Sequence, residues 1–186
     1  MNYNLYEISV SPKNDKFQKT LYIIFTILKY LNLTVIGVSL VLTVSLFTYF
    51  IVVALIFVVS YLICLYFSSK FYNYYDYSFV GGSIRIIKVV NNKMRRLTID
   101  FDAKNIISIG NVFGETYNKY YKDKSVKNLF ASPNAFTEDD IVIYFNKSGK
   151  DYLLFLQYDE GFMTVITKYI GTKKLDKDFI EKIKNS

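Results

Sequence analysis

Basic side chains gather around one short turn of this sequence, where they could bind phosphate groups. The group consists of Lys88, Lys93, Arg95 and Arg96, on either side of the Asn91-Asn92 pair. A basic residue close to an anionic lipid surface contributes about 1 kcal/mol of binding. The alternative is a solubilising hairpin tip, because a net charge of +7 is modest for a lipid-binding protein. The four residues are therefore candidate contacts for an anionic surface.

A second basic group alternates lysines with tyrosines. Its members are Lys119, Lys122, Lys124 and Lys127, with Tyr117, Tyr120 and Tyr121 among them. Single-stranded nucleic acids bind to such mixtures by stacking bases on aromatic rings. Glu115 and Asp123 interrupt the group, and the chain also carries a membrane-like apolar block, so we expect no nucleic-acid partner. The pattern favours a loop, with peptide or protein contact as the alternative.

Catalytic and metal-binding residue types are scarce. The chain has no histidine and one cysteine, Cys64, inside an apolar stretch. The usual general base, zinc ligand and pH switch are therefore missing. Asp100 and Asp102 share one side of a predicted strand but have no evident partner, and "TEDD" at 137–140 lacks the glycine of a calcium loop. We expect a non-enzymatic protein with no cofactor and no metal site.

An apolar block in the first half of the chain predicts membrane insertion. Residues 20–69 contain one charged side chain, Lys29. As helix this block would be roughly 75 Å long, more than twice the ~30 Å hydrocarbon core. We therefore predict two spans, at about 22–42 and 46–68, with a turn near Thr43, Ser45 and Thr48. The lipid bilayer is then one partner, and the cell membrane the location of a multi-pass protein.

Charges and aromatic residues predict the orientation of this hairpin. Lysines lie before the first span and at the end of the second, whereas the turn has no charge, so both termini should face the cytoplasm. The predicted interface anchors are Lys29, Lys70, Phe71 and Tyr72. Lys29 should extend its side chain to the interface, and a functional charge inside the membrane is the alternative. Asn32, Gly37 and Ser39 could form a small-residue contact between the helices.

Beyond the apolar block the hydrophobic period becomes that of strands. The change falls near Asn73, almost without a linker. Predicted strands surround Tyr77 and Ile84, joined by a tight Gly81-Gly82 turn, and others cover about 94–100, 105–110, 140–146 and 151–158. The stretch between Asn111 and Asp140 reads mainly as loop, with one possible strand near 126–131. Helices are expected after Asp159 and at about 176–184.

The predicted fold class is α+β. An N-terminal transmembrane helical hairpin precedes an antiparallel β-barrel or sandwich. The barrel would be partly open, and a C-terminal helix would cover its opening. The chain would then comprise a cytoplasmic N-terminal segment at 1–19, the hairpin at 20–70 and a cytoplasmic domain at 73–186.

This order of elements resembles a known family. The two spans, the segment "LTIDFDAKNIISIG" and the helix after "LLFLQYDEGF" resemble bacterial two-span membrane proteins with a pleckstrin-homology-like (PH-like) domain. The resemblance implies this fold and topology, and it implies no reaction. Where inositol-lipid recognition would use a long basic loop between the first two strands, this sequence has the tight Gly81-Gly82 turn.

We expect a scaffold or adaptor held at the bilayer, with a protein or peptide as a second partner. The partner would add a strand to an exposed sheet edge or to a groove beside the helix that starts near Glu160. The alternatives are a sensor of anionic lipid surfaces and an accessory subunit of a transport or cell-envelope complex.

Overall fold

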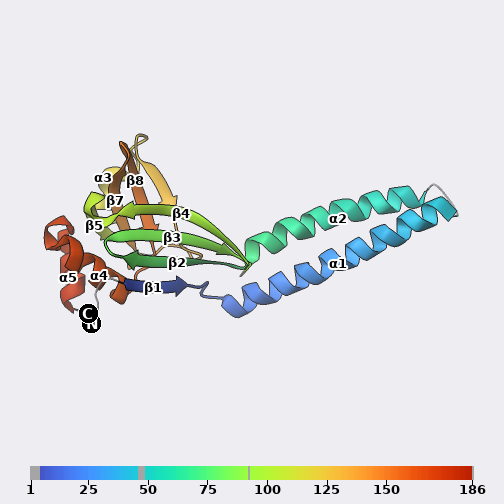
Figure 1. Cartoon of the computed structure of the whole chain (residues 1–186), viewed down its shortest axis with the longest axis horizontal. Coiled ribbons are helices and arrows are strands. Elements are labelled where there is room, and N and C mark those ends of the chain that lie inside the picture. The colour runs from blue at the N-terminus through green and yellow to red at the C-terminus, as the bar shows by residue number, and fades with distance from the viewer. Residues whose placement is uncertain (1–4, 46–48, 92, 186) are drawn as a thin grey trace. The chain divides into compact units, whose positions relative to one another are not determined.

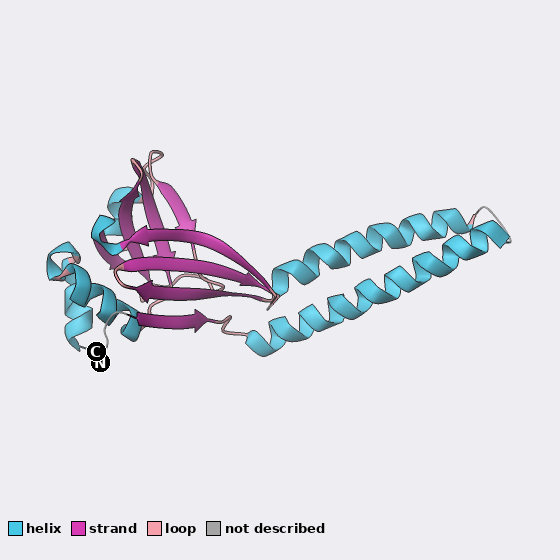
Figure 2. Ribbon diagram, in the orientation of Figure 1, coloured by secondary structure: helices cyan, strands magenta, loops and turns pink. Residues whose placement is uncertain are grey.

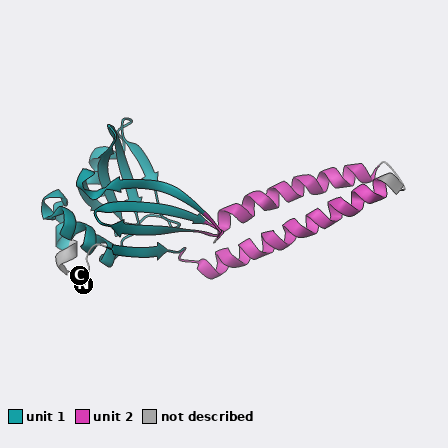
Figure 3. Cartoon of the chain, viewed as in Figure 1, with its two compact units in different colours: residues 1–11, 74–89, 95–186 teal, residues 12–73, 90–94 magenta. Residues whose placement is uncertain are grey.

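The computed structural model describes residues 5–45, 49–91 and 93–185 (Figure 1). The chain forms two compact units, each discontinuous in sequence (Figure 3). One comprises residues 1–11, 74–89 and 95–186, and contains the strands. The other comprises residues 12–73 and 90–94, and contains two long helices.

The helical unit is an antiparallel pair, α1 (Asp15–Ser45) and α2 (Phe50–Phe71). Its direction follows from side-chain pairs, since Phe25 stacks on Phe71 at 5.5 Å between ring centroids and Asn32 bonds to Ser60. α1 begins before the predicted limit of 22, because polar residues such as Asp15 and Lys16 continue the helix beyond its apolar stretch. The predicted turn lies partly in residues 46–48, outside the described residues.

The first sheet has the order β1-β2-β3-β4 (Figure 2). Its strands are β1 (Leu5–Val10), β2 (Asn73–Val80), β3 (Ser83–Val90) and β4 (Met94–Asp102). β1 lies in the N-terminal segment for which no strand was predicted. It pairs antiparallel with β2, from Leu5 opposite Val80 to Val10 opposite Tyr75. This partner lies beyond both helices in sequence, so a local pattern cannot reveal the pairing.

The second sheet has the order β5-β7-β8-β6. Its strands are β5 (Ile106–Asn111), β6 (Lys127–Phe130), β7 (Ile141–Lys147) and β8 (Lys150–Leu156). β6 runs parallel to β8, so the prediction of a wholly antiparallel domain was wrong. The described strands form two four-stranded sheets and no closed barrel, which supports the sandwich alternative within the predicted α+β class.

The two sheets share one hydrophobic core. Its fully buried members include Tyr77, Ile84, Ile143 and Phe145. Helix α4 (Glu160–Ile170) adds Phe162, Met163 and Ile166, and α5 (Lys177–Asn185) adds Phe179. Both helices were predicted near these positions. The remaining elements are short, namely η1 (Ala103–Asn105), α3 (Glu115–Tyr120) and η2 (Thr172–Lys174).

Gly81 and Gly82 form the predicted tight turn between β2 and β3. Their φ angles are +57° and +93°, in the region that favours glycine. A Cβ atom on Gly82 would also collide with the Tyr169 ring of α4. The backbone therefore favours glycine at both positions, and the lack of space also favours it at Gly82.

The N-terminal strand β1 is joined to α4 by a side-chain contact. The Tyr6 hydroxyl donates a hydrogen bond to Asp159 Oδ1 at 2.8 Å, and Asp159 also accepts from the Phe162 amide at 2.7 Å as the helix N-cap. A Cβ atom on Gly161 would collide with the Tyr6 ring. The start of α4, where we expected a groove for a peptide, therefore lies against the chain's own first strand.

We expect Tyr6→Phe to lower the free energy of unfolding by about 1 kcal/mol at neutral pH, because only the hydrogen bond to Asp159 is lost. Burial, the hydrogen bond and the Asp159 charge raise the pKa of Tyr6 from 10.0 to about 12. A group whose pKa is higher in the folded than in the unfolded state contributes stability that is fully present below the unfolded-state pKa. This contribution is lost as the pH rises through the folded-state pKa. The difference between wild type and variant should therefore shrink between pH 10 and about 12.

Urea unfolding of the full chain in detergent micelles, followed by circular dichroism, measures this difference. Tyr121→Phe is the control, because that ring is on the surface, and it should change the unfolding free energy little. A Tyr6→Phe variant as stable as wild type at neutral pH would contradict the role assigned to this bond.

Candidate functional site

The helices α1 and α2 are long and apolar enough to cross a membrane. Only 11% of the residues in the most apolar stretch of each helix are buried. Large apolar side chains such as Leu31, Leu55 and Ile56 are more than half exposed. The apolar helices of a water-soluble core would bury these side chains.

Aromatic residues gather where the start of α1 meets the end of α2. Tyr22 stacks on Tyr72 at 6.1 Å, and Phe25 stacks on both Phe67 and Phe71 at 5.5 Å. Two of the predicted anchors, Phe71 and Tyr72, belong to this group. Rings at one end of a helical pair are typical of a membrane–water interface.

The two lysines predicted as anchors both contact tyrosines. Lys70 Nζ lies 4.5 Å from the centre of the Tyr66 ring, and Lys29 Nζ lies 4.6 Å from that of Tyr30. Such cation–π contacts contribute about 0.5–1 kcal/mol at exposed sites. They give each ammonium group an amphipathic neighbour, as expected for side chains that extend toward an interface.

Polar contacts between the helices involve Asn32. This side chain is buried, and its Nδ2 donates to Ser60 Oγ at 3.0 Å and to Cys64 Sγ at 3.7 Å. Ser39 is buried as well. Gly37, in contrast, has no neighbouring atom within 4 Å of an ideal Cβ position, so it is not part of the predicted small-residue contact.

The basic hairpin residues are distributed over β3, the following turn and β4. Lys88 Nζ lies 5.8 Å from the centre of the Tyr75 ring, and Lys93 is exposed in the turn. Arg95 forms an ion pair with Asp76 at 3.7 Å, and Arg96 is exposed beside it. The four residues thus have different surroundings, and Arg95 is already partnered by a carboxylate.

Asp76 is a site residue that the sequence analysis missed. It is only 4% exposed, and it accepts a hydrogen bond from Ser9 Oγ at 2.6 Å besides its ion pair with Arg95. It therefore connects β1, β2 and β4. A buried carboxylate needs such partners, so an aspartate between buried tyrosines of a strand was the available signal.

Asn91, the residue after β3, is hydrogen-bonded to Tyr72, the residue after α2. The Asn91 amide donates to the Tyr72 carbonyl at 2.7 Å, and Asn91 has a φ of +54°, which asparagine tolerates. Residues 90–94, including Lys93, belong to the same compact unit as the helices. Lys93 therefore lies at the end of the helical pair that carries the aromatic group.

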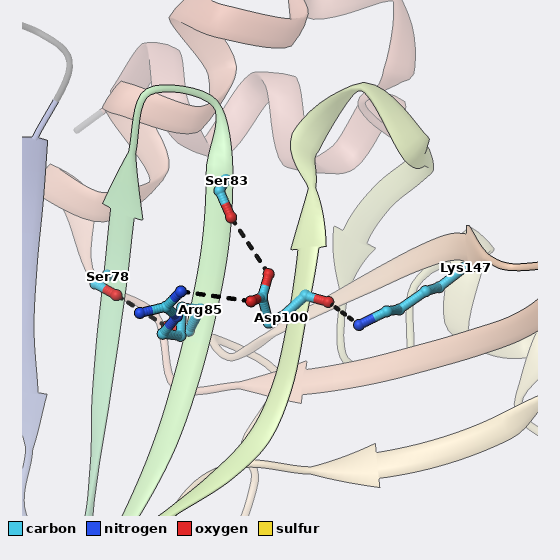
Figure 4. A network of polar contacts seen from close by, with 5 residues as sticks. All are labelled: Ser78, Ser83, Arg85, Asp100 and Lys147. Carbon is cyan, nitrogen blue, oxygen red and sulfur yellow. Dashed lines mark hydrogen bonds and ion pairs between the residues drawn. The ribbon is translucent and has the colours of Figure 1, made fainter.

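A polar network joins β2, β3 and β4 (Figure 4). Asp100 forms an ion pair with Arg85 at 3.5 Å and accepts from Ser83 Oγ at 3.3 Å. Lys147 of β7 donates to the Asp100 carbonyl, which connects the second sheet to the first. A shallow hollow of about 300 Å³ beside this ion pair is lined by Arg85, Ile87, Arg95, Leu97 and Asp100.

Other aspartates, among them Asp102 and Asp140, which were singled out in the sequence, stabilise turns and helix ends. Asp102 accepts from the Lys104 amide at 2.8 Å as the N-cap of η1. Asp140, in the "TEDD" segment, accepts from the Thr137 amide at 2.8 Å and the Tyr158 amide at 3.1 Å. Asp176 accepts from the amide and the hydroxyl of Thr116 at 2.8 and 2.7 Å. Over the described ranges, no three His, Cys, Asp or Glu side chains are grouped to hold a metal ion.

The second basic group includes the strand predicted near 126–131, which is β6, and a short helix that was not predicted, whereas Lys122 and Lys124 lie in the turn between them. Lys119 and its tyrosine neighbours belong to α3, and Lys127 begins β6. Tyr120 stacks on Tyr144 of β7 at 3.7 Å, and Lys119 Nζ lies 5.0 Å from the centre of the Tyr120 ring. The stacking of Tyr120 on Tyr144 thus holds α3 against β7.

Comparison with known proteins gives one match. The sequence profile of the family described as "Bacterial PH-like domain (DUF6106)" matches residues 5–175. No curated protein and no solved structure matches the chain. The matched residues begin at the first residue of β1 and include both long helices and both sheets. The chain therefore belongs to this family of bacterial PH-like domains.

Proposed function

We propose that this chain is a non-enzymatic membrane protein whose PH-like domain is a cytoplasmic scaffold or adaptor for a protein partner. In this proposal α1 and α2 cross the cell membrane as a hairpin. The observation that carries it is the exposure of the apolar side chains along both helices. Such surface is stable in contact with lipid, whereas in water it would drive association.

The charge distribution supports cytoplasmic termini. Lys13, Lys16 and Lys19 lie at or near the start of α1 and Lys70 lies in the last turn of α2, while residues 41–50 carry no charge. Positive residues are retained on the cytoplasmic side of membrane hairpins. The aromatic group between the start of α1 and the end of α2 would then mark the cytoplasmic interface.

The hydrogen bonds of the buried and partly buried carboxylates support a binding function over a catalytic one. Asp76, Asp140, Asp159 and Asp176 each accept at least two hydrogen bonds or ion pairs from neighbouring strands and helix ends. General acids and bases need a site from which they reach a substrate. These four carboxylates instead stabilise the domain.

A short connection supports function at the bilayer. Only Tyr72 separates the last residue of α2 from the first of β2. An adaptor attached in this way would present its binding surfaces within a restricted distance of the membrane, which raises the effective concentration for membrane-bound partners.

Photo-crosslinking in living cells tests the adaptor function. A photoreactive amino acid would replace, one at a time, the exposed residues Leu97, Val80 and Phe130, and Leu55 of α2 would serve as the control facing lipid. We expect at least one domain position to form a discrete adduct with one protein, and position 55 to form lipid adducts. The identity of the captured protein separates an adaptor from an accessory subunit of a larger complex. Lipid adducts alone at every position would contradict the proposal.

A second candidate function is the sensing of anionic lipid. It is favoured by the hydrogen bond from Asn91 to Tyr72, because this contact brings Lys93 to the end of α2. If that end lies at the interface, Lys93 would be within reach of lipid headgroups, and Lys88 precedes it in the same hairpin.

We expect the variant Lys88→Gln/Lys93→Gln to bind anionic lipid less tightly. Two basic residues near the surface contribute about 2 kcal/mol, or roughly thirtyfold in affinity. Native mass spectrometry of the full chain, purified with mixed zwitterionic and anionic lipids, measures the retained anionic lipid. Lys150→Gln/Lys173→Gln removes the same charge from exposed positions elsewhere and should change little. Equal retention in both variants would contradict lipid sensing by the hairpin.

A further inference from the structure

A continuous group of aromatic rings lies around α3, β6 and β8, on the second sheet. We call it the aromatic surface, and its members are Phe113, Tyr117, Tyr121, Phe130, Phe136 and Phe155. Phe155 of β8 is buried and contacts four of the others, at centroid distances from 4.7 to 6.0 Å. These rings thus pack on a buried residue of the second sheet.

Several of these rings remain exposed. Phe113 is 55% exposed, Phe130 52% and Tyr121 36%. Large aromatic side chains that remain exposed together are typical of the central residues of protein interfaces.

Phe113 combines exposure with an unfavourable backbone. Its φ is +68°, which for a bulky residue is an outlier. The Phe113 ring contacts Tyr117 edge to face at 5.1 Å, but most of its surface remains in solvent. Glycine would adopt this backbone without strain, so core packing does not explain a phenylalanine here. Strain that the fold does not require is typical of residues with a binding role.

The stretch from α3 to β6, which carries part of the aromatic surface, has an excess of positive charge. Lys119, Lys122, Lys124 and Lys127 are exposed along α3 and the approach to β6. Two acidic residues lie within this stretch, the exposed Glu115 and Asp123, which accepts hydrogen bonds from the amide and hydroxyl of Ser125 at 2.9 and 2.7 Å, so four lysines face two carboxylates. The segment that follows Phe136 carries the exposed Glu138 and Asp139.

We infer that the aromatic surface binds an acidic, hydrophobic segment of a protein partner, with its carboxylates over the lysines of α3 and β6. This inference rests on the proposed adaptor function and identifies the partner chemistry. A membrane or a nucleic acid fits less well, because its regularly spaced phosphates would also meet Glu138 and Asp139, whereas a peptide can place apolar side chains there. The ring faces of Tyr117 and Tyr121 also stack on each other at 4.6 Å, which leaves less of them for nucleobases.

Peptide binding to the full chain in nanodiscs of zwitterionic lipid tests this inference. The probes are a short fluorescein-labelled peptide of glutamates with two phenylalanines, and the same peptide with lysines in place of the glutamates. We expect the acidic peptide to bind at least about tenfold more tightly, with an affinity that falls as salt is added. Equal binding of both peptides, or no binding of the acidic one, would overturn the inference.

Two variants test the residues. Phe113→Gly/Phe130→Ser should lower the affinity for the acidic peptide by about tenfold or more, as expected for central aromatic contacts. Lys122→Glu/Lys127→Glu should reduce the preference for the acidic peptide and its salt dependence. The matched control Val80→Ser/Leu97→Ser removes two apolar side chains of similar exposure from the first sheet, and it should leave binding unchanged. Loss of binding in the control but not in the aromatic variant would contradict this location.

The single variant Phe113→Gly separates an effect on binding from an effect on stability. Because glycine relieves the backbone at this position, the variant should melt at the same temperature as wild type or higher, while it binds the peptide less tightly. A lower melting temperature with unchanged binding would assign Phe113 a purely structural role.

The crosslinking experiment separates failure of this inference from failure of the adaptor function. Adducts at position 80 or 97 but none at position 130 would leave the adaptor function in place and overturn the aromatic surface as its site. Anionic vesicles that compete for the aromatic surface more strongly than the acidic peptide would assign it to lipid instead.

Discussion

The antiparallel pairing of β1 with β2 is the constraint on which the rest of the structure depends. Val10 lies opposite Tyr75, although both long helices intervene between them in sequence. The chain therefore leaves the first sheet and returns to it at neighbouring strands. This closes the helical hairpin at its base, and a hairpin whose ends are held together favours antiparallel packing of its two helices.

Several other contacts depend on this pairing. With β1 in the sheet, Tyr6 reaches Asp159 at the start of α4, and Ser9 reaches the buried Asp76. Without it, two carboxylates would lose hydrogen-bond donors, one of them almost fully buried. The N-terminal strand β1 thus lies directly before α1 in sequence and is part of the PH-like domain in the structure. The domain therefore completes its first sheet only with a strand from the other side of the helical insertion.

Local signals in the sequence were sufficient for some elements. The change from apolar helix to strand near Asn73 and the tight turn at Gly81-Gly82 were predicted because charge, period and glycine report on neighbouring residues. The contact made by Asn32 was predictable because a polar residue in an apolar helix needs a partner. β1 and the parallel pairing of β6 were not predictable, because their partners are distant in sequence. The exposed ring of Phe113 was missed because its significance comes from a backbone angle that no composition reveals.

The central claim is that the α1–α2 hairpin crosses the membrane and leaves the paired strands on the cytoplasmic side. Single cysteines at Tyr49, the residue before α2, and at Ser148, in the β7–β8 turn, test it in a Cys64→Ser background with a membrane-impermeant maleimide. In intact cells we expect labelling at position 49 only, and in lysed cells labelling at both positions. Labelling of position 148 in intact cells, or protection of position 49, would contradict this topology.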